Sequence, residues 1–123
     1  MVAYESKITE LGEKADHVES DFFEPNMMIF FGDSVPETLK QYCYILNTSE
    51  INSPIKKGMH LNINDDEFEI LYVGRLVESN LRDLAHVTVV FTDYIGHVLP
   101  GQIVVKGKRP SEVKLGDTIS ITE

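Results

Sequence analysis

The chain has little cysteine, no long apolar run and few basic residues, and each shortage excludes a class of protein. Cys43 is the single cysteine among 123 residues, so no internal disulfide can form, and no cysteine and histidine cluster has zinc-site spacing. The longest apolar runs, such as residues 27–31, are far shorter than the ~20 residues of a membrane helix. The first residues contain no secretory signal. We therefore expect a soluble cytoplasmic protein that is not membrane-embedded and needs no metal or other cofactor.

Basic residues are outnumbered by acidic ones, 11 to 20, and the formal net charge is −9. Binding to a phosphate backbone requires a basic patch, so nucleic acid is not expected as a partner. An acidic surface favours solubility and steers the chain toward a basic partner protein. The simpler interpretation of the same charge is a solvated surface without a partner.

Short segments of alternating polarity, separated by turn residues, predict an all-β protein. The length suits one domain, residues 1–123, with a hydrophobic core of its own. We expect strands at 3–11, 27–31, 44–46, 59–63, 67–72, 86–92, 102–106 and 118–122, and a strand fragment with a surface loop at 13–25. Short helices are expected at 36–42, capped by Ser34, and at 80–84, capped by Ser79. Together these elements predict a single-domain closed β-barrel or sandwich with one or two short helices.

Catalytic motifs with a strong signature are missing from the sequence. It contains no glycine-rich phosphate loop, no G-x-S-x-G, no H-E-x-x-H and no C-x-x-C. The absence of these four motifs excludes the enzyme classes that each of them identifies. It does not exclude a phosphoryl carrier, in which one nucleophilic histidine holds the group and the remaining chemistry is positioning.

His86 is the best candidate for such a nucleophile. It directly follows the second short helix, and strand alternation places it with Thr88 on the face opposite Val87, Val89 and Phe91. A reachable imidazole with an ordinary pKa of about 6.5 is partly neutral at cellular pH, as a nucleophile must be. The simpler interpretation is a polar residue at a strand start, hydrogen-bonded to a nearby loop.

The other three histidines and the cysteine are weaker candidates. His60 lies on a hairpin strand and is expected to face solvent, His97 lies in a turn-rich stretch, and His17 lies in the acidic loop. Cys43 stands between two tyrosines, so we expect it to be buried and unreactive.

Several stretches of the chain match one known family. The most specific is the block Asn-Leu-Arg-x-Leu-x-His at 80–86, which continues through residue 89. The segment 37–44, which ends in Tyr-Cys-Tyr, the Pro-Gly pair at 100–101 and the turn at Gly116 match as well. On these residues, and over essentially its whole length, the chain resembles the glucitol/sorbitol-specific IIA components of the bacterial phosphotransferase system.

The resemblance implies an all-β barrel that relays a phosphoryl group during sugar uptake. The group would pass from the phosphocarrier HPr, through a transient phosphohistidine on this chain, to the IIB part of the IIB/IIC transporter. In the family pattern the phosphorylated histidine lies on the strand after the first short helix, near Leu46 here, where this sequence has no histidine.

That departure leaves two alternatives. In the first, His86 is the acceptor, and Ser79, Asn80 and Arg82 supply groups that hold the phosphoryl oxygens, with Arg82 as the charge-assisted donor. In the second, the chain is a non-catalytic binding or regulatory module that keeps the docking surface and has lost the chemistry.

A third interpretation is a small β-barrel enzyme that uses His86 with Asp83 or Asp93. The sequence offers no third group to orient that pair, which counts against it. The sugar and the oligomeric state, a homodimer included, do not follow from the sequence.

Overall fold

The protein folds into a closed barrel of short strands. The computed structural model describes residues 2–15, 26–47, 50–92, 98–110 and 113–123. Within these residues the elements are β1 (Val2–Leu11), β2 (Met27–Phe31), α1 (Glu37–Lys40), β3 (Cys43–Leu46), β4 (His60–Ile63), β5 (Asp66–Val73), α2 (Val77–Leu84), β6 (Val87–Thr92), β7 (Gln102–Lys106) and β8 (Thr118–Thr122). The predicted all-β fold with two short helices is confirmed, and of the two architectures expected it is the barrel.

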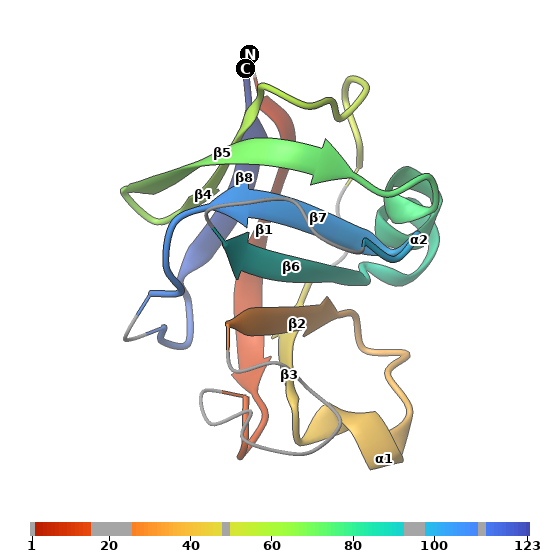
Figure 1. The fold of residues 1–123 in the computed structure, drawn as a ribbon. Coiled ribbons are helices and arrows are strands. Elements are labelled where there is room, and N and C mark those ends of the chain that lie inside the picture. Colours follow the sequence, from red (N-terminus) through yellow and green to blue (C-terminus); the bar gives the residue numbers. More distant parts are fainter. Residues whose placement is uncertain (1, 16–25, 48–49, 93–97, 111–112) are drawn as a thin grey trace.

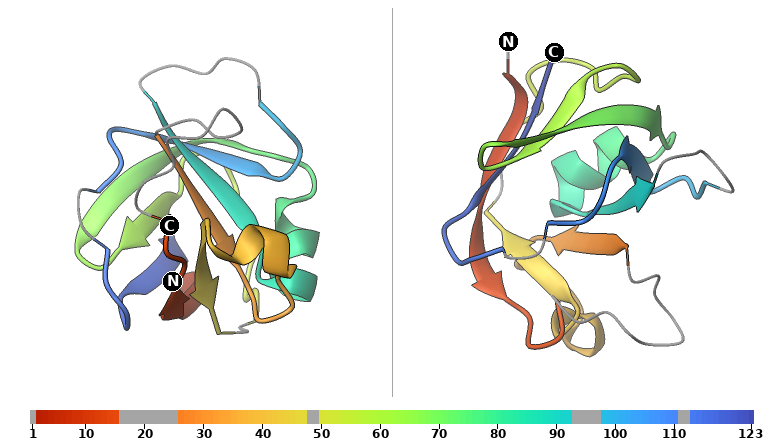
Figure 2. Two further views of the ribbon diagram at one scale, coloured as in Figure 1. Left: turned by 90° about the horizontal axis from the view of Figure 1, so that it is seen from below. Right: turned by 60° about the vertical axis from the view of Figure 1, so that its left-hand side comes forward.

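The strand order around the barrel is β1-β3-β2-β6-β7-β5-β4-β8, and β8 closes the sheet onto β1. Most neighbours are antiparallel, but β2–β3 and β6–β7 are parallel pairs. Both helices lie on the same side of the barrel, and the two chain ends lie together at the β1–β8 seam (Figures 1 and 2). No helix in the described part of the chain is long and apolar enough to cross a membrane.

The barrel interior is filled by one face of each strand, as the alternation predicts. Along β6, Val87, Val89 and Phe91 are buried, whereas the residues between them are only half-buried. Phe91 meets Phe68 of β5 edge-on inside the barrel, with ring centroids 5.0 Å apart. This interior burial supplies most of the driving force for folding.

β2 and β3 differ from the other strands because both of their faces are buried. Their inward residues join the barrel core. Their outward residues, together with Val35 from the segment between β2 and α1, form a second apolar cluster, which consists of Ile29, Phe31, Val35, Cys43 and Ile45. This outer cluster includes Phe31, which lies beside the candidate site.

The caps predicted for both helices are wrong, and α2 begins earlier than predicted. α1 starts after Pro36, which has extended backbone angles, and no side chain caps it, so the predicted Ser34 cap is wrong. α2 starts at Val77, and Ser79 lies inside the helix rather than capping it. The reason is packing: Val77 and Leu81 lie one turn apart and are both buried, so contact with the core extends the helix toward its N-terminus. Of the predicted segment 13–25, residues 16–25 lie outside the described residues.

Candidate functional site

His86 stands where α2 ends and β6 begins. Ala85 takes a left-handed conformation, with φ of 53°, and its N–H donates back into the last turn of α2. The N–H of His86 then donates to the carbonyl oxygen of Asn80 at 3.2 Å. A left-handed residue with such back-bonds is a common helix ending, and here it turns the chain so that the His86 ring reaches the end of β2.

The His86 ring is held by two contacts with β2. Its Nδ1 lies 3.0 Å from the carbonyl oxygen of Phe30, and its plane stacks on Phe31 with ring centroids 4.2 Å apart and an interplanar angle of 26°. A carbonyl oxygen can only accept, so Nδ1 carries the proton in the neutral ring and Nε2 carries the lone pair. Among the described residues nothing forms a hydrogen bond with Nε2. The site therefore presents an oriented imidazole with a free nucleophilic nitrogen.

The residues next to the His86 ring are closely packed and held by hydrogen bonds. Phe31 belongs to the outer cluster and is 8% exposed. The next residue, Gly32, donates its N–H to the carbonyl of Leu84 at 2.9 Å, which ties the end of β2 to the end of α2. A Cβ at Gly32 would lie 2.7 Å from that carbonyl oxygen, so the close approach needs glycine. The contacts that orient His86 thus come from elements fixed to each other.

The predicted phosphate-binding residues are distributed around α2. Asn80 is linked to His86 through its backbone carbonyl. The hydroxyl of Ser79 donates to the carbonyl of Leu76 at 3.1 Å. Nε of Arg82 donates to Asp83 at 3.3 Å on the exposed surface, and Arg82 also lines a pocket formed with residues 50–54. In this arrangement Asn80 contacts the histidine, while Ser79 and Arg82 contact other groups.

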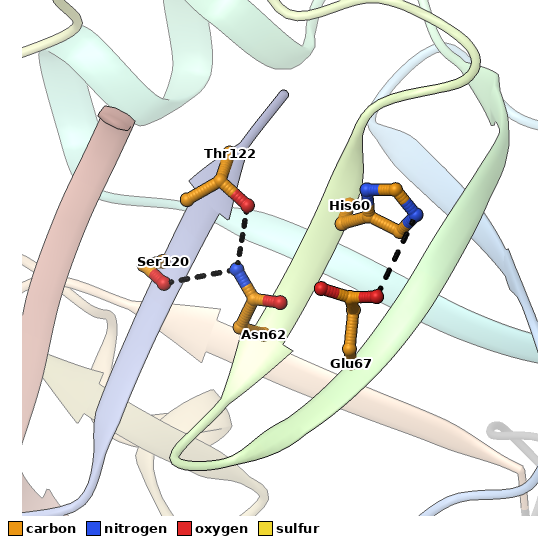
Figure 3. Close-up of polar contacts among 5 residues, drawn as sticks. All are labelled: His60, Asn62, Glu67, Ser120 and Thr122. Carbon is orange, nitrogen blue, oxygen red and sulfur yellow. Dashed lines mark hydrogen bonds and ion pairs between the residues drawn. The ribbon is translucent and has the colours of Figure 1, made fainter. Parts of the chain in front are cut away.

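His60 sits in a different environment, on the outer face of the β4–β5 hairpin. Its Nε2 lies 3.8 Å from a carboxylate oxygen of Glu67, and its Nδ1 is buried without a hydrogen-bond partner among the described residues. Beside it, the amide of Asn62 donates to the hydroxyls of Ser120 and Thr122, at 3.2 and 3.0 Å (Figure 3). His60 is thus oriented toward a carboxylate.

The remaining candidates from the sequence are three residues that the structure does not describe and the single cysteine. His17, His97 and Asp93 lie outside the described residues. Within the described residues, no three or more histidine, cysteine, aspartate or glutamate side chains are grouped to hold a metal ion. Cys43 is buried, as predicted: its thiol donates to the carbonyl of Leu39 at 3.2 Å, and burial raises its pKa to about 11. Leu46 is 2% exposed and packs in the barrel core.

The comparison with protein families now decides the identity of this barrel. The family model described as "PTS system glucitol/sorbitol-specific IIA component" matches residues 3–120. The chain belongs to this family. The resemblance noted in the sequence is therefore confirmed.

Relatives and a solved structure agree with this assignment. Proteins of Shigella flexneri and of Escherichia coli K12, each named PTS system glucitol/sorbitol-specific EIIA component, are 30% identical to the chain over 118 residues, which is 96% of this chain and 93% of theirs. The crystal structure of a PTS system IIA component from Enterococcus faecalis V583 has a TM-score of 0.78 at 27% identity, and the match covers 97% of this chain and 99% of that one.

Sequence reasoning missed the residues that orient His86. The Phe30 carbonyl lies 56 positions away along the chain, and a backbone carbonyl leaves no signature in a sequence. In the sequence, Phe31 is recognisable only as one member of an apolar run. The one available signal was the unbroken run 27–31, whose members are buried on both faces and must therefore contact something outside the barrel.

Proposed function

We propose that this chain is a phosphocarrier of a glucitol/sorbitol phosphotransferase system, and that His86 takes a phosphoryl group from phospho-HPr and passes it to the IIB component. The observation that carries the proposal is the 3.0 Å contact between Nδ1 of His86 and the Phe30 carbonyl. It supports a single tautomer, in which Nε2 is the nucleophile. A nucleophile that is already oriented loses little entropy on reaching the transition state.

In the proposed transfer, the lone pair of Nε2 attacks the phosphorus atom on the side opposite the HPr imidazole. The new N–P bond forms as the bond to HPr breaks, and the departing nitrogen keeps the electron pair. The His86 ring then carries positive charge because Nδ1 retains its proton. The Phe30 carbonyl stabilises that charge by accepting from Nδ1, and donation to IIB reverses the same steps.

The phosphoryl oxygens need donors, and the groups proposed for them are on α2. Arg82 is the strongest, since a guanidinium gives charge-assisted hydrogen bonds, and Ser79 and Asn80 add neutral donors. Arg82 must exchange its contact with Asp83 for the phosphoryl group. Both side chains of that pair are 63% exposed, and such pairs contribute only about 0–1 kcal/mol, so the exchange costs little.

The proposed partners are HPr and the IIB/IIC transporter, and the proposed compartment is the cytoplasm. The net charge of −9 supports fast, transient encounter with a basic surface on HPr. Exposed charges are screened beyond about 8–10 Å at physiological salt, so we expect weak association that becomes weaker at high salt. Chemical-shift titration with HPr at two salt concentrations measures this.

The deciding experiment is incubation with enzyme I, HPr and phosphoenolpyruvate, followed by intact-mass measurement. A carrier gains one acid-labile phosphate. The absence of any gain while HPr still binds supports the second candidate, a non-catalytic regulatory module. One observation favours that candidate: Leu46, near the acceptor position of the family pattern, is an apolar core residue.

A further inference from the structure

One flank of α2 is apolar and exposed. Leu76, Asn80 and Leu84 follow each other at intervals of four residues, so their side chains lie along one stripe of the helix. Leu76 is 41% and Leu84 is 39% exposed, although Val77 and Leu81 on the adjoining face are buried. Single exposed leucines are ordinary on a protein surface, but a contiguous group marks an interaction site.

A third exposed leucine extends this stripe. Leu99 is 51% exposed and belongs to the turn 99–101, which precedes β7 and lies beside α2 (Figure 1). The N–H of Leu76 donates to the carbonyl of Pro100 at 2.9 Å, which fixes the turn against the start of the helix. We call the combined surface the α2 patch, and it consists of Leu76, Asn80, Leu84, Leu99, Pro100 and Gly101, none of which is charged.

The stripe on α2 is the same when it is reversed. Asn80 stands at its centre, with one leucine four residues before it and another four residues after it. Two α2 helices packed antiparallel about a twofold axis at Asn80 would place Leu76 of each copy against Leu84 of the other. The two Asn80 amides would meet at the axis, where each can donate to and accept from the other.

Charged residues at the rim of the patch have the same symmetry. Arg75 directly precedes the first leucine of the stripe, Asp83 directly precedes the last, and both are exposed. In the antiparallel pair, Arg75 of each copy would come close to Asp83 of the other, so two ion pairs cross the interface. Asp83 contacts Arg82 only in an exposed pair, which leaves it free to turn. The surface therefore complements itself in charge as well as in apolar area.

We propose that the α2 patch binds a second copy of this chain and that the dimer covers His86. Position 86 lies six residues after Asn80, and the position six residues before it is Gly74, which packs against the turn 99–101. The twofold axis would thus place the turn of the second copy over the His86 ring. This regulatory consequence rests on the proposed function, in which His86 must be reached by HPr.

The dimer is expected to be weak. A stable homodimer buries roughly 800 Å² or more on each partner, whereas the large apolar side chains of this patch are three partly exposed leucines on each copy. The net charge of −9 on each copy also opposes association. We therefore expect a Kd between about 10 μM and 1 mM, so that self-association competes with other partners only at high concentration.

The test is sedimentation velocity of the full chain between about 10 μM and 1 mM, with amide chemical shifts of ¹⁵N-labelled protein over the same dilution. We expect a reversible dimer and shifts at residues 74–86 and 99–101. Leu99→Gln should weaken the dimer about tenfold or more, since the change acts once in each copy. Leu115→Gln, a matched change in the turn before β8 at a leucine that is 63% exposed, should leave the Kd unchanged.

Charge reversal separates the proposed geometry from a nonspecific apolar contact. Arg75→Asp places two carboxylates near each other across the interface and should weaken the dimer about tenfold. The double change Arg75→Asp and Asp83→Arg restores opposite charges and should return the Kd to within about threefold of the parent value. A chain that stays monomeric at the highest concentration overturns the proposal, and so does a double variant that does not recover.

Coverage of His86 is measured with phosphoramidate, a small donor that phosphorylates imidazoles without a docking protein. The rate per chain should fall as the concentration of the parent rises and should stay constant in Leu99→Gln. A constant rate in a parent that dimerises overturns the coverage of His86. HPr-induced shifts in the patch of a chain that stays monomeric assign the patch to HPr instead. If the parent dimerises but takes phosphate from neither donor, the proposed relay fails, while dilution shifts at residue 86 still report its coverage.

Discussion

His86 and His60 stand in different regions of one barrel, and their surroundings differ in the feature that matters for phosphoryl transfer. At the corner between α2 and β6, Nδ1 of His86 faces a carbonyl and its ring stacks on Phe31. On the outer face of the β4–β5 hairpin, Nε2 of His60 faces the carboxylate of Glu67. The first arrangement leaves a lone pair directed away from the barrel, and the second places a carboxylate next to the ring nitrogen.

The difference shows that orientation, more than exposure, separates the two histidines. Both side chains are half-buried. The partner of His86 is uncharged and comes from the backbone, so it fixes the ring and adds no negative charge that would repel an incoming phosphoryl group. Glu67 adds such a charge next to His60. The following predictions test this comparison, beginning with the largest expected effect.

The largest effect is expected from His86→Gln, which removes the nucleophile but keeps a side chain of similar size. Phosphate incorporation from phospho-HPr should fall to background because the amide of glutamine cannot replace the imidazole as a nucleophile. The measurement is intact mass after incubation with enzyme I, HPr and phosphoenolpyruvate. His60→Gln is the matched control and should incorporate phosphate at the parent rate. If His60→Gln loses phosphate incorporation and His86→Gln keeps the parent rate, the acceptor is His60 and the proposed assignment is wrong.

The second largest effect is expected on the rate at which Cys43 is alkylated, because this residue lies with Phe31 in the outer cluster. Burial raises its pKa from an ordinary 9.0 to about 11. Below pH 9 the thiol stays protonated in the folded state, and at pH 8 the thiolate fraction is about 100-fold lower than in the unfolded chain. Alkylation by iodoacetamide should slow by at least that factor on folding. Equal rates in folded and urea-unfolded protein would mean that the wall behind His86 is open.

Arg82→Gln should reduce phosphoryl transfer roughly tenfold, because a charge-assisted bond to the phosphoryl oxygens is lost while the nucleophile remains. Rapid-quench kinetics with phospho-HPr measure the rate. Asp83→Asn is the paired variant: it releases Arg82 from its present contact and should leave transfer unchanged or faster. An unchanged rate in Arg82→Gln would restrict this arginine to the pocket beside residues 50–54.

Much of the fold could be predicted because the strands alternate. The pattern of β6 and the β4–β5 hairpin follow from period two alone, and closure of many short strands follows from their number. The parallel pairs β2–β3 and β6–β7 could not be predicted, since strand order depends on contacts between distant segments. The start of α2 was misplaced because burial of Val77 outweighed the capping preference of Ser79.

The candidate site was predicted in part. His86 could be chosen from its place after a helix and from strand parity. Its orientation could not, because this depends on the Phe30 carbonyl and on the left-handed turn at Ala85, a residue that rarely adopts it. The pocket beside α2 also escaped prediction. Its walls come from two segments that the sequence pattern marks only as a loop and a helix.

The smallest effect is expected from Asn62→Ala, a change close to His60 on the outer face of β4. The Asn62 amide donates to Ser120 and Thr122 and so links β4 to β8 on the outer face (Figure 3). Each such bond contributes about 0.5–1.5 kcal/mol, and water can replace it at this half-buried position, so we expect a loss of about 1 kcal/mol in the free energy of unfolding. Urea denaturation measures this loss, and Ser120→Ala, which removes one of the two bonds, should cost about half as much. Phosphate incorporation should not change in either variant, because the contacts that hold His86 come from β2 and α2. A fall in transfer without a fall in stability would show that the outer face of β4 and β8 takes part in the relay.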